Sequence, residues 1–585
     1  MKTTSKRLLI GLLSLAMAAS MTACTNGGSS ASSSADGTAS QASDSGKPDT
    51  WIADREITVQ SFIDDQGLSL PSDMKNNPIA QELKKRTGMS INVIYVSGNN
   101  DLEVLTTSLA AGDLPDAIDF YLNDSTRPEF PVLLKAAREG MFTDVAPLLK
   151  DTKVYKKYLE DGFLPEDSKT NVMFRPEFNG ACYLIHMNVP RSEKVGEENR
   201  LRGGMWIQKS IAEDLNVDIT SVKTEDDLYN LLKQIKAKNY TDANGNPIYP
   251  LGPSVWGGRY LANEVLNNYN FGLSSGFNLL DGKVMHESET DYVYKQIEFY
   301  QKLFKEELIN PEMFTLDPSR ANELSLNLSS GIMADNHNFM LVSTGQADDP
   351  ANVSSKYLPL GDNLTDYAGR TVTWSKAKSC YGGIAIPATT KKPEEVLKLF
   401  DYLASKEGKL LWMYGIEGTD YTLDSNGFPQ ITDSAYERSL NTDAEKEYGL
   451  PGTGGSLWLN FLGATDMDNM ADFGETSYGE SRNVEKTKQA LDLYNTNPIH
   501  LQYYEGFDAN AYLSDLPEVE AKLQALVKMD KYEEVKEQAI LSGNMDEARK
   551  IIETYVKQLK DNGLDEFKAH LQEIYDKNPK AISFR

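Results

Sequence analysis

The stretch from Ser90 to Leu122 decides the fold, and it reads SINVIYVSGNNDLEVLTTSLAAGDLPDAIDFYL. Two short apolar runs, Ser90–Val96 and Ala117–Leu122, have the composition of buried strands. Between them, Asn100–Ala111 has the pattern of a helix, which Gly112 stops. A strand, a helix and a second strand in this order predict one unit of a largely parallel sheet in which helices connect the strands.

The same alternation extends to both sides of this stretch. Further strands are predicted at Arg55–Ile63, Gly180–Met187, Gly331–Ala334 and Tyr381–Ile386. Helices are predicted at Asn77–Lys85, Gln208–Leu215, Glu225–Lys238, Glu289–Glu306 and Glu394–Ser405. Residues 515–577 have the pattern of several amphipathic helices in succession. The order of these elements predicts an α/β fold with a helical C-terminal section.

Length, charge and cysteine content narrow the class of protein. The chain has 585 residues, more than one hydrophobic core usually serves, so we expect two or more lobes. Its net charge of −27 would repel phosphate backbones and anionic lipids, so we expect no nucleic-acid partner. Three cysteines cannot form a disulfide scaffold, and no CxxC pair suggests a zinc or redox site. We therefore expect neither a metal nor a cofactor.

The N-terminus has the pattern of an export signal. Lys2, Lys6 and Arg7 precede an apolar run, Leu8–Ala19, and small residues then lead to Cys24. A lipoprotein signal peptidase recognises this pattern, which predicts residues 1–23 as a signal peptide and Cys24 as the lipidated residue, carrying palmitate. A plain secretory signal or a membrane anchor is the alternative, although a membrane span needs ~20 apolar residues. Residues 24–50 are rich in Ser and Gly and predict a disordered tether.

Patterns typical of enzymes carry little weight in this chain. Gly272–Gly276 spells G-x-S-x-G, but the nucleophile turn needs a strand before it and a helix after it, and a loop is predicted here. The five histidines are scattered without the paired spacing of a metal site. Among 86 Asp and Glu residues, a pair of carboxylates suited to glycoside hydrolysis is easy to find and carries no information. We expect no enzymatic activity.

Several segments resemble one known family. They are Ala111–Asp116 (AGDLPD), Met205–Lys209 (MWIQK), Gly415–Pro429 (GIEGTDYTLDSNGFP) and the region from Leu541 to Asp565. They resemble segments of the extracellular solute-binding proteins of carbohydrate ABC transporters, family 1, to which maltose-binding proteins belong. The last two are similar to segments of the large lipoproteins of Firmicutes. The chain is identified as a member of this family from about residue 55 to residue 577.

This resemblance implies a two-lobed, periplasmic-binding-protein-like fold with a hinge. Lobe 1 would comprise residues 51–185 and about 380–435, and lobe 2 would comprise about 186–379 and about 436–585, including the helical C-terminal section. The implied protein is a lipid-anchored receptor on the extracellular face of a Gram-positive cell membrane. It would capture an oligosaccharide in the cleft between its lobes and deliver it to the permease subunits of an ABC importer.

The resemblance also implies how the protein associates, and it leaves alternative functions. The protein would be a monomer that meets the membrane only through its lipid anchor. A receptor for a peptide or another polar solute, or a secreted glycan hydrolase, is the alternative to an oligosaccharide receptor.

A sugar cleft needs aromatic rings that stack on C–H faces and polar groups that satisfy hydroxyls. Trp458 and Trp256 lie in Gly-rich, polar segments that have no register to bury them. Other candidates stand beside a cysteine of a predicted strand, or directly after a strand, where α/β proteins bind ligands. These candidates are Tyr183, Tyr381, Asn336, His337, Asp64, Asp65 and Asp124. A core or surface role is the alternative for each of them, and it is the preferred role for Trp412 and Trp206.

The Asp242–Asn246 segment and the cysteines at 182 and 380 each have two possible interpretations. Asp242–Asn246 (DANGN) resembles the first half of a calcium loop in alginate-binding relatives, but Pro250 and Leu251 stand where carboxylates would follow. An Asn-Gly turn between a helix and a strand is therefore preferred. Cys182 and Cys380 fall on strands that, by the resemblance, run between the lobes, and they could bridge if their Cα atoms lie within roughly 7 Å. Two buried free thiols are preferred.

Overall fold

The computed structural model describes residues 47–62, 70–96, 101–121, 129–164, 168–186, 204–252, 276–335, 357–360, 382–450 and 506–584, apart from 318–319, 322, 325–326, 426, 440, 508 and 528. Two mixed sheets and many helices organise these residues, so the predicted α/β class is confirmed. None of the helices in these ranges is both long enough and apolar enough to cross a membrane.

The larger sheet has five strands in the order β2-β1-β3-β11-β4. The strands are β1 (Arg55–Phe62), β2 (Met89–Tyr95), β3 (Ala117–Tyr121), β4 (Ile185–His186) and β11 (Gly382–Ala385). β1 runs parallel to β2 and β3, whereas β11 runs antiparallel to both of its neighbours. The sheet is therefore built from two stretches of chain that lie almost 200 residues apart in the sequence.

The sequence signals that predicted the first helix act as expected. α1 (Pro78–Thr87) starts at Asn77, whose side-chain oxygen accepts a hydrogen bond from the Ala80 N–H at 2.9 Å. The proline at the first helical position has no N–H that would need a partner. The helix ends at Gly88, which has a φ of 76° and could not carry a side chain, because a Cβ there would lie 2.4 Å from the Ala53 carbonyl oxygen.

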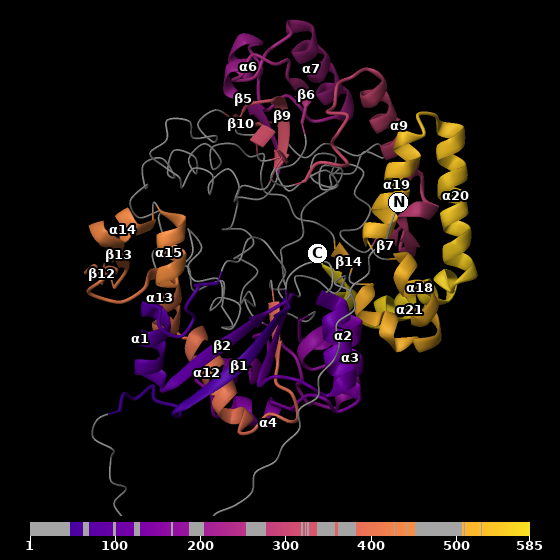
Figure 1. The fold of residues 1–585 in the computed structure, drawn as a ribbon. Helices are drawn as coiled ribbons and strands as arrows, with labels where there is room; N and C mark the ends of the chain where they lie inside the picture. The colour runs from indigo at the N-terminus through magenta and orange to yellow at the C-terminus, as the bar shows by residue number, and fades with distance from the viewer. Residues whose placement is uncertain are drawn as a thin grey trace, which may run out of the picture. The chain divides into compact units, whose positions relative to one another are not determined.

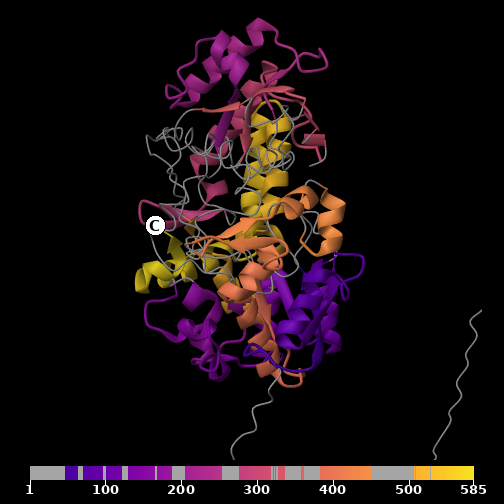
Figure 2. The same ribbon diagram turned by 90° about the vertical axis from the view of Figure 1, so that its left-hand side faces the viewer.

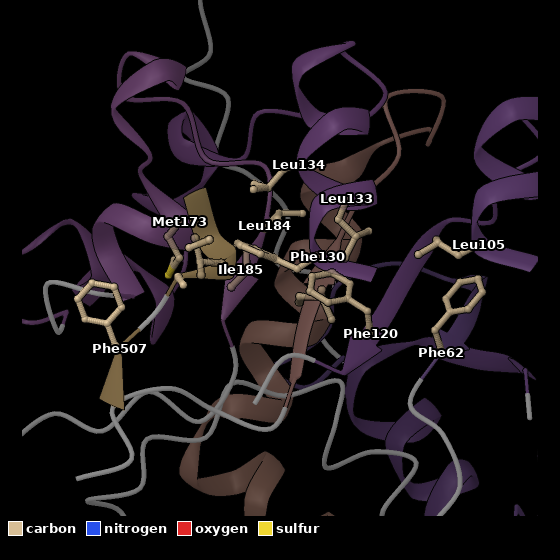
Figure 3. Close-up of a cluster of buried hydrophobic side chains, with 14 of the residues drawn as sticks. Phe62, Leu105, Phe120, Phe130, Leu133, Leu134, Met173, Leu184, Ile185 and Phe507 are labelled. Atoms are coloured by element: carbon tan, nitrogen blue, oxygen red, sulfur yellow. The ribbon is translucent and has the colours of Figure 1, made fainter. Parts of the chain in front are cut away.

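One buried cluster joins the larger sheet to the helices that cover it. The helices are α2 (Asp101–Ala111) and α3 (Glu129–Arg138). Phe62 of β1 lies beside Leu105 of α2, and Phe120 of β3 lies beside Phe130 of α3 (Figure 3). All four side chains are fully buried or nearly so. This packing fixes α2 and α3 against the carboxyl-terminal halves of β1 and β3.

The smaller sheet has four strands in the order β10-β5-β9-β6. The strands are β5 (Gly204–Gln208), β6 (Tyr249–Leu251), β9 (Ser330–Asp335) and β10 (Tyr357–Leu360). α6 (Lys209–Asp214) follows β5 directly, and α7 (Glu225–Lys238) begins with a reciprocal cap between Thr224 and Asp227. The predicted apolar face of α7 is buried: Leu228, Leu231, Leu232 and Ile235 are at most 5% exposed.

The helical C-terminal section is confirmed. Its helices are α18 (Pro517–Val527), α19 (Met529–Leu541), α20 (Met545–Asp561) and α21 (Leu564–Lys577), and they follow the short helix η11 (Asn510–Asp515). α19 and α20 pack against each other and lie side by side in Figure 1, and Figure 2 shows the yellow C-terminal helices from the left-hand side of that view. They pack on α9 (Asp291–Lys305), and α21 packs on β8 of the hairpin β7 (Phe277–Leu280) and β8 (Lys283–His286).

Shorter elements complete the described chain. Near the larger sheet are α4 (Ala146–Leu149), η1 (Tyr155–Leu159), the π-helix η2 (Ser168–Met173), η3 (Pro176–Phe178), α12 (Pro393–Ala404) and α13 (Lys406–Tyr414). The others are η6 (Glu287–Glu289), β12 (Tyr421–Leu423), β13 (Pro429–Ile431), α14 (Asp433–Ser439), α15 (Thr442–Tyr448), β14 (Gly506–Phe507), α22 (Pro579–Ile582) and β15 (Ser583–Phe584).

One predicted strand is much shorter than expected. Of the predicted range Gly180–Met187, only Ile185–His186 pairs in the sheet among the residues described. The backbone of Cys182 is bonded elsewhere: its N–H donates to the Asp144 carboxylate at 2.9 Å, and its C=O accepts from the Val145 N–H at 2.8 Å. These bonds hold the start of the apolar run against the segment before α4, so it cannot join β11.

Candidate functional site

The carboxyl ends of three strands share one edge of the larger sheet with the start of a fourth. β1 and β3 run parallel and end at Phe62 and Tyr121. β11 runs the other way, and its first residue, Gly382, pairs with Tyr121. Its second residue, Gly383, pairs with His186 at the end of β4. Chain segments that follow or precede these strands therefore leave the sheet at the same edge, the place where α/β proteins bind ligands.

Most of the predicted site residues lie outside the described residues, although several are close in sequence to this edge. Asp64 and Asp65 come two and three positions after β1, Asp124 comes three after β3, and Tyr381 immediately precedes β11. Trp458 and the lipidation residue Cys24 also lie outside the described residues. Their assignment stays a prediction.

The smaller sheet has a comparable edge. β6 and β9 are parallel, with Leu251 paired to Ile332, so their carboxyl ends point the same way. The predicted residues Asn336 and His337 follow β9 directly, and Trp256 follows β6 within five residues. All three lie outside the described residues.

Tyr183 is the one predicted ligand-binding residue within the described part of the chain. It is half-buried, packs against the core, and meets the ring of Phe178 edge-on at a centroid distance of 4.9 Å. It precedes β4, three residues before His186, and so lies toward the opposite end of that short strand. The structure thus separates Tyr183 along the strand from the edge that the other candidates flank.

Asp119 is a buried acid in the middle of β3. Its side chain is 2% exposed, and the Ser61 hydroxyl of the neighbouring strand donates to Oδ2 at 3.1 Å. Its other oxygen, Oδ1, has no hydrogen-bond partner among the residues described. Burial raises the pKa of Asp119 well above its ordinary value, and the Ser61 hydrogen bond opposes this only in part. Burial therefore favours the protonated, neutral form of Asp119 over the carboxylate.

His186 ends β4 at the same edge. Its ring is 1% exposed, and neither ring nitrogen has a partner within the described part of the chain. Burial lowers the pKa of His186 to about 3, so the imidazole is neutral. Across the pair, Gly383 has no room for a side chain, because a Cβ there would lie 2.6 Å from the Phe120 ring. This close packing fixes where β3 and β11 meet.

Asp119 and His186 keep hydrogen-bonding capacity that the described residues do not use. A neutral acid and a neutral imidazole can each donate and accept. Within the described ranges, no group of three or more His, Cys, Asp or Glu side chains is placed to hold a metal ion. The G-x-S-x-G segment ends at Gly276, where the strand β7 follows rather than the helix that a nucleophile turn requires.

The segment Asp242–Asn246 forms the predicted turn between a helix and a strand. Asp242 Oδ1 accepts hydrogen bonds from the backbone N–H groups of Asn244 and Asn246, at 2.9 and 2.8 Å. Oδ2 accepts from the Ser329 hydroxyl at 3.1 Å. Gly245 has a φ of 83°, as an Asn-Gly turn requires. The carboxylate thus organises its own turn and ties it to the residue before β9.

Other predicted side-chain roles can be compared directly with the structure. Cys182 is a buried free thiol whose pKa is raised by burial, while Cys380 lies outside the described residues. Trp412 is a core residue, as predicted: it is 3% exposed and its indole N–H donates to the Leu403 carbonyl at 3.0 Å. Trp206, also 3% exposed, is buried within β5 as predicted.

Sequence reasoning did not single out Asp119 or His186. The available signal was an acid inside an apolar strand run, Ala117-Ile118-Asp119-Phe120, because an unpaired carboxyl is rarely placed in a sheet core without a role. For His186 the signal was weaker, since a histidine within an apolar run is usually a core residue.

Comparison with known proteins identifies the relatives of this chain. Residues 188–410 match the family of bacterial extracellular solute-binding proteins. Lipoprotein LipO of Bacillus subtilis (strain 168) is 24% identical over 373 residues, which cover 62% of this chain and 68% of that protein.

Solved structures share the fold. The alginate-binding protein AlgQ2, solved without calcium ion, is 20% identical with a TM-score of 0.65, over 91% of this chain and 100% of that chain. The S. pneumoniae substrate-binding protein FusA, in complex with kestose, is 18% identical with a TM-score of 0.61, over 89% and 99% of the two chains. The expected two-lobed, periplasmic-binding-protein-like fold is thereby confirmed.

Proposed function

We propose that the chain is an extracellular solute-binding protein of an ABC transporter, which captures an oligosaccharide and delivers it to a membrane importer. The observation that carries the choice of ligand is the likeness of fold, over 89–91% of the chain, to an alginate-binding protein and to a protein solved with kestose. Asp119, in the middle of β3, and His186, at the end of β4, are buried polar groups near this sheet edge, and the described residues leave part of their hydrogen-bonding capacity unused.

The proposed mechanism needs no covalent step. The ligand lies between two lobes, comprising residues 51–185 with about 380–435 and about 186–379 with about 436–585. Contacts made only in the closed arrangement shift the equilibrium toward that arrangement, which the permease subunits then recognise. The protein acts as a monomer, held at the extracellular face of the membrane by a lipid on Cys24. Neither sheet needs to span both lobes, because the two sheets take their strands from different segments of the chain.

A thermal-shift screen tests the choice of ligand. A solute that binds only the native protein stabilises it by about 2.7 kcal/mol when its concentration is roughly 100 times its Kd. We expect at least one neutral oligosaccharide to raise the melting temperature, and peptides of similar size to leave it unchanged. A rise with peptides alone would assign the protein to the alternative class of peptide receptors.

A pair of tryptophan variants tests the predicted stacking residue. Trp458→Ala should weaken oligosaccharide binding by roughly 5- to 150-fold and leave the ligand-free melting temperature nearly unchanged, because a stacked ring contributes about 1–3 kcal/mol. Trp412→Ala is the matched control: its indole is buried, so it should lose about 3–5 kcal/mol of stability instead. If Trp458→Ala behaves like the control, Trp458 is a core residue.

The anchor has its own test. Cys24→Ala should release the protein into the medium or leave it unprocessed. A variant that stays lipid-linked and fractionates with membranes as before would contradict the assignment of Cys24.

A further inference from the structure

We propose that the chain carries a second, peripheral binding site for a neutral saccharide, in a groove that extends from the amino-terminal edge of the larger sheet along the face of β1 and β2. The groove encloses about 970 Å³ and is lined by β1, β2, α2, the AGDLPD turn and the segment before α12. Its volume falls in the range of small-molecule sites. The inference rests on the proposed function and extends it with a second place for the same class of ligand.

The groove begins at the sheet edge opposite to the strand ends discussed above. Asp116 immediately precedes β3, and Arg55 is the first residue of β1, so both mark the amino-terminal edge of the parallel strands. Thr390 closes the groove from the segment after β11, with its hydroxyl donating to the Asp116 carbonyl at 2.9 Å. This edge is opposite to the carboxyl edge at which Phe62 and Tyr121 end.

The groove exists because α2 covers only part of one sheet face. Phe62 and Leu105 close the carboxyl half of that face (Figure 3). On the amino-terminal side of Phe62, Thr58 and Gln60 of β1 stay half-buried, and Ile94, paired with Gln60 near the end of β2, is 48% exposed. An exposed isoleucine between polar side chains offers an apolar surface to the C–H face of a sugar ring.

Three polar side chains in the groove are available to a ligand. Among the residues that the structure describes, the Thr58 hydroxyl, the Gln60 amide and the Ser108 hydroxyl of α2 have no hydrogen-bond partner, although each residue is half-buried. Together they supply both donors and acceptors. Half-buried polar groups without a protein partner gain most from a ligand rich in hydroxyls.

A fixed charged group stands next to them. The Arg55 guanidinium is held by Asp116 at 2.6 Å and by Glu395 at 3.2 Å, and the Thr58 N–H donates to the second Asp116 oxygen at 2.9 Å. The Arg55 guanidinium and the Asp116 and Glu395 carboxylates are planar and held in fixed orientations. Their N–H groups and lone pairs therefore point in fixed directions, which suits hydrogen bonding to two neighbouring hydroxyls of a sugar.

The charge balance selects the class of ligand. Four carboxylates and three cationic side chains line the groove: Asp54, Asp113, Asp116, Glu395, Arg55, Lys391 and Lys392. Such a balance favours neither a polyanion nor a polycation over a neutral molecule. Hydroxyl-binding groups, an apolar platform and a nearly balanced charge together indicate a neutral saccharide.

Hydrogen exchange, followed by mass spectrometry, tests this site. The probes are maltotetraose, cellotetraose and nystose at millimolar concentration, with trigalacturonate as the charged comparison. We expect a neutral probe to slow exchange in peptides that contain residues 102–116 and 389–395. Two variants should each need about ten times more probe for the same protection. They are Gln60→Leu, which removes the amide, and Ser108→Trp, which fills the groove. Thr107→Trp, exposed at the next position of α2, is the control and should keep it.

The outcomes separate the two proposals. If a neutral oligosaccharide raises the melting temperature but protects neither of these segments, the peripheral site is refuted and the proposed function stands. Equal protection by trigalacturonate, or protection that survives in both Gln60→Leu and Ser108→Trp, also refutes the site as described. If no oligosaccharide raises the melting temperature or changes exchange anywhere, the proposed function fails with it.

Discussion

Replacing Asp119 with Asn tests whether this buried acid holds its proton in the folded protein. Asn has nearly the shape of a protonated carboxyl, and it can still accept from the Ser61 hydroxyl, which lies 3.1 Å from Oδ2. Below pH ~4 the carboxyl is protonated in both the folded and the unfolded state, so Asp119→Asn should change the stability there by no more than about 1 kcal/mol. Asp119→Ala removes the hydrogen bond and leaves a small cavity, and should cost about 2–3 kcal/mol.

The pH dependence has a definite sign. Burial raises the pKa of Asp119 in the folded state, so the folded protein binds a proton that the unfolded chain has lost above its ordinary pKa of 3.8. The stability that Asp119 contributes is therefore complete below pH ~4 and falls as the pH rises toward the folded pKa. The difference in unfolding free energy, wild type minus Asp119→Asn, should fall by about 1.4 kcal/mol per pH unit in this window.

Two assays measure these quantities. Urea denaturation at a series of pH values gives the slope, with Asp161→Asn, an exposed aspartate, as the control that should show no such difference. Infrared difference spectra between wild type and Asp119→Asn at pH 7 should contain the carbonyl band of a protonated carboxyl. A flat difference in stability together with no such band would refute the reasoning, because Asp119 would then be ionised and paired.

Three further predictions concern the packing around the site and the C-terminal section. Glu287 is buried beside α19, and burial raises its pKa to about 7. Its stabilising contribution should therefore fade as the pH rises from about 4.5 through about 7, and Glu287→Gln should flatten that part of a plot of melting temperature against pH. Asn171→Ala should cost about 2–3 kcal/mol in denaturant unfolding, because the amide donates to the Ala581 carbonyl at 2.7 Å from a buried position. Asn76→Ala, at an exposed position, should cost little. Gly383→Ala should lower the melting temperature, because its Cβ would lie 2.6 Å from a ring carbon of Phe120; an unchanged value would mean that the two strands can shift apart.

Much of the fold could be predicted because local chemistry and tertiary structure agree. Asn77 and the proline after it start α1, and the Thr224 cap starts α7, since these side chains satisfy N–H groups that any helix leaves unpaired. The apolar run that forms β3 lies inside the sheet, because burial on both faces requires that composition, whereas the run at 90–96 forms the edge strand β2, whose Ile94 is 48% exposed.

Other elements escaped prediction, for two different reasons. The hairpin of β7 and β8 had a readable signal: Asp281-Gly282, with φ values of 51° and 77°, forms the tight turn that an Asp-Gly pair favours. The shortening of the strand before His186 had none, because it depends on the Asp144 carboxylate, 38 residues away in the sequence. Only a tertiary hydrogen bond decides that the chain leaves the sheet there.

The position of the candidate site could be predicted from the sequence, but the environment of its buried side chains could not. Strand ends at one sheet edge follow from the order of elements, and Asp64 and Asp124 were chosen for that reason. The neutral state of Asp119 does not follow from sequence, because it depends on complete burial between neighbouring strands.

Native mass spectrometry tests the central claim most directly. The mature protein is incubated with the oligosaccharide that gives the largest thermal shift, and both the complex and the sugar recovered after denaturation are weighed. The account predicts a complex that carries the intact oligosaccharide at the high-affinity site, and a recovered sugar of unchanged mass and length. Recovery of shorter products would contradict it in favour of a hydrolase, and the absence of any complex would contradict the assignment of an oligosaccharide ligand.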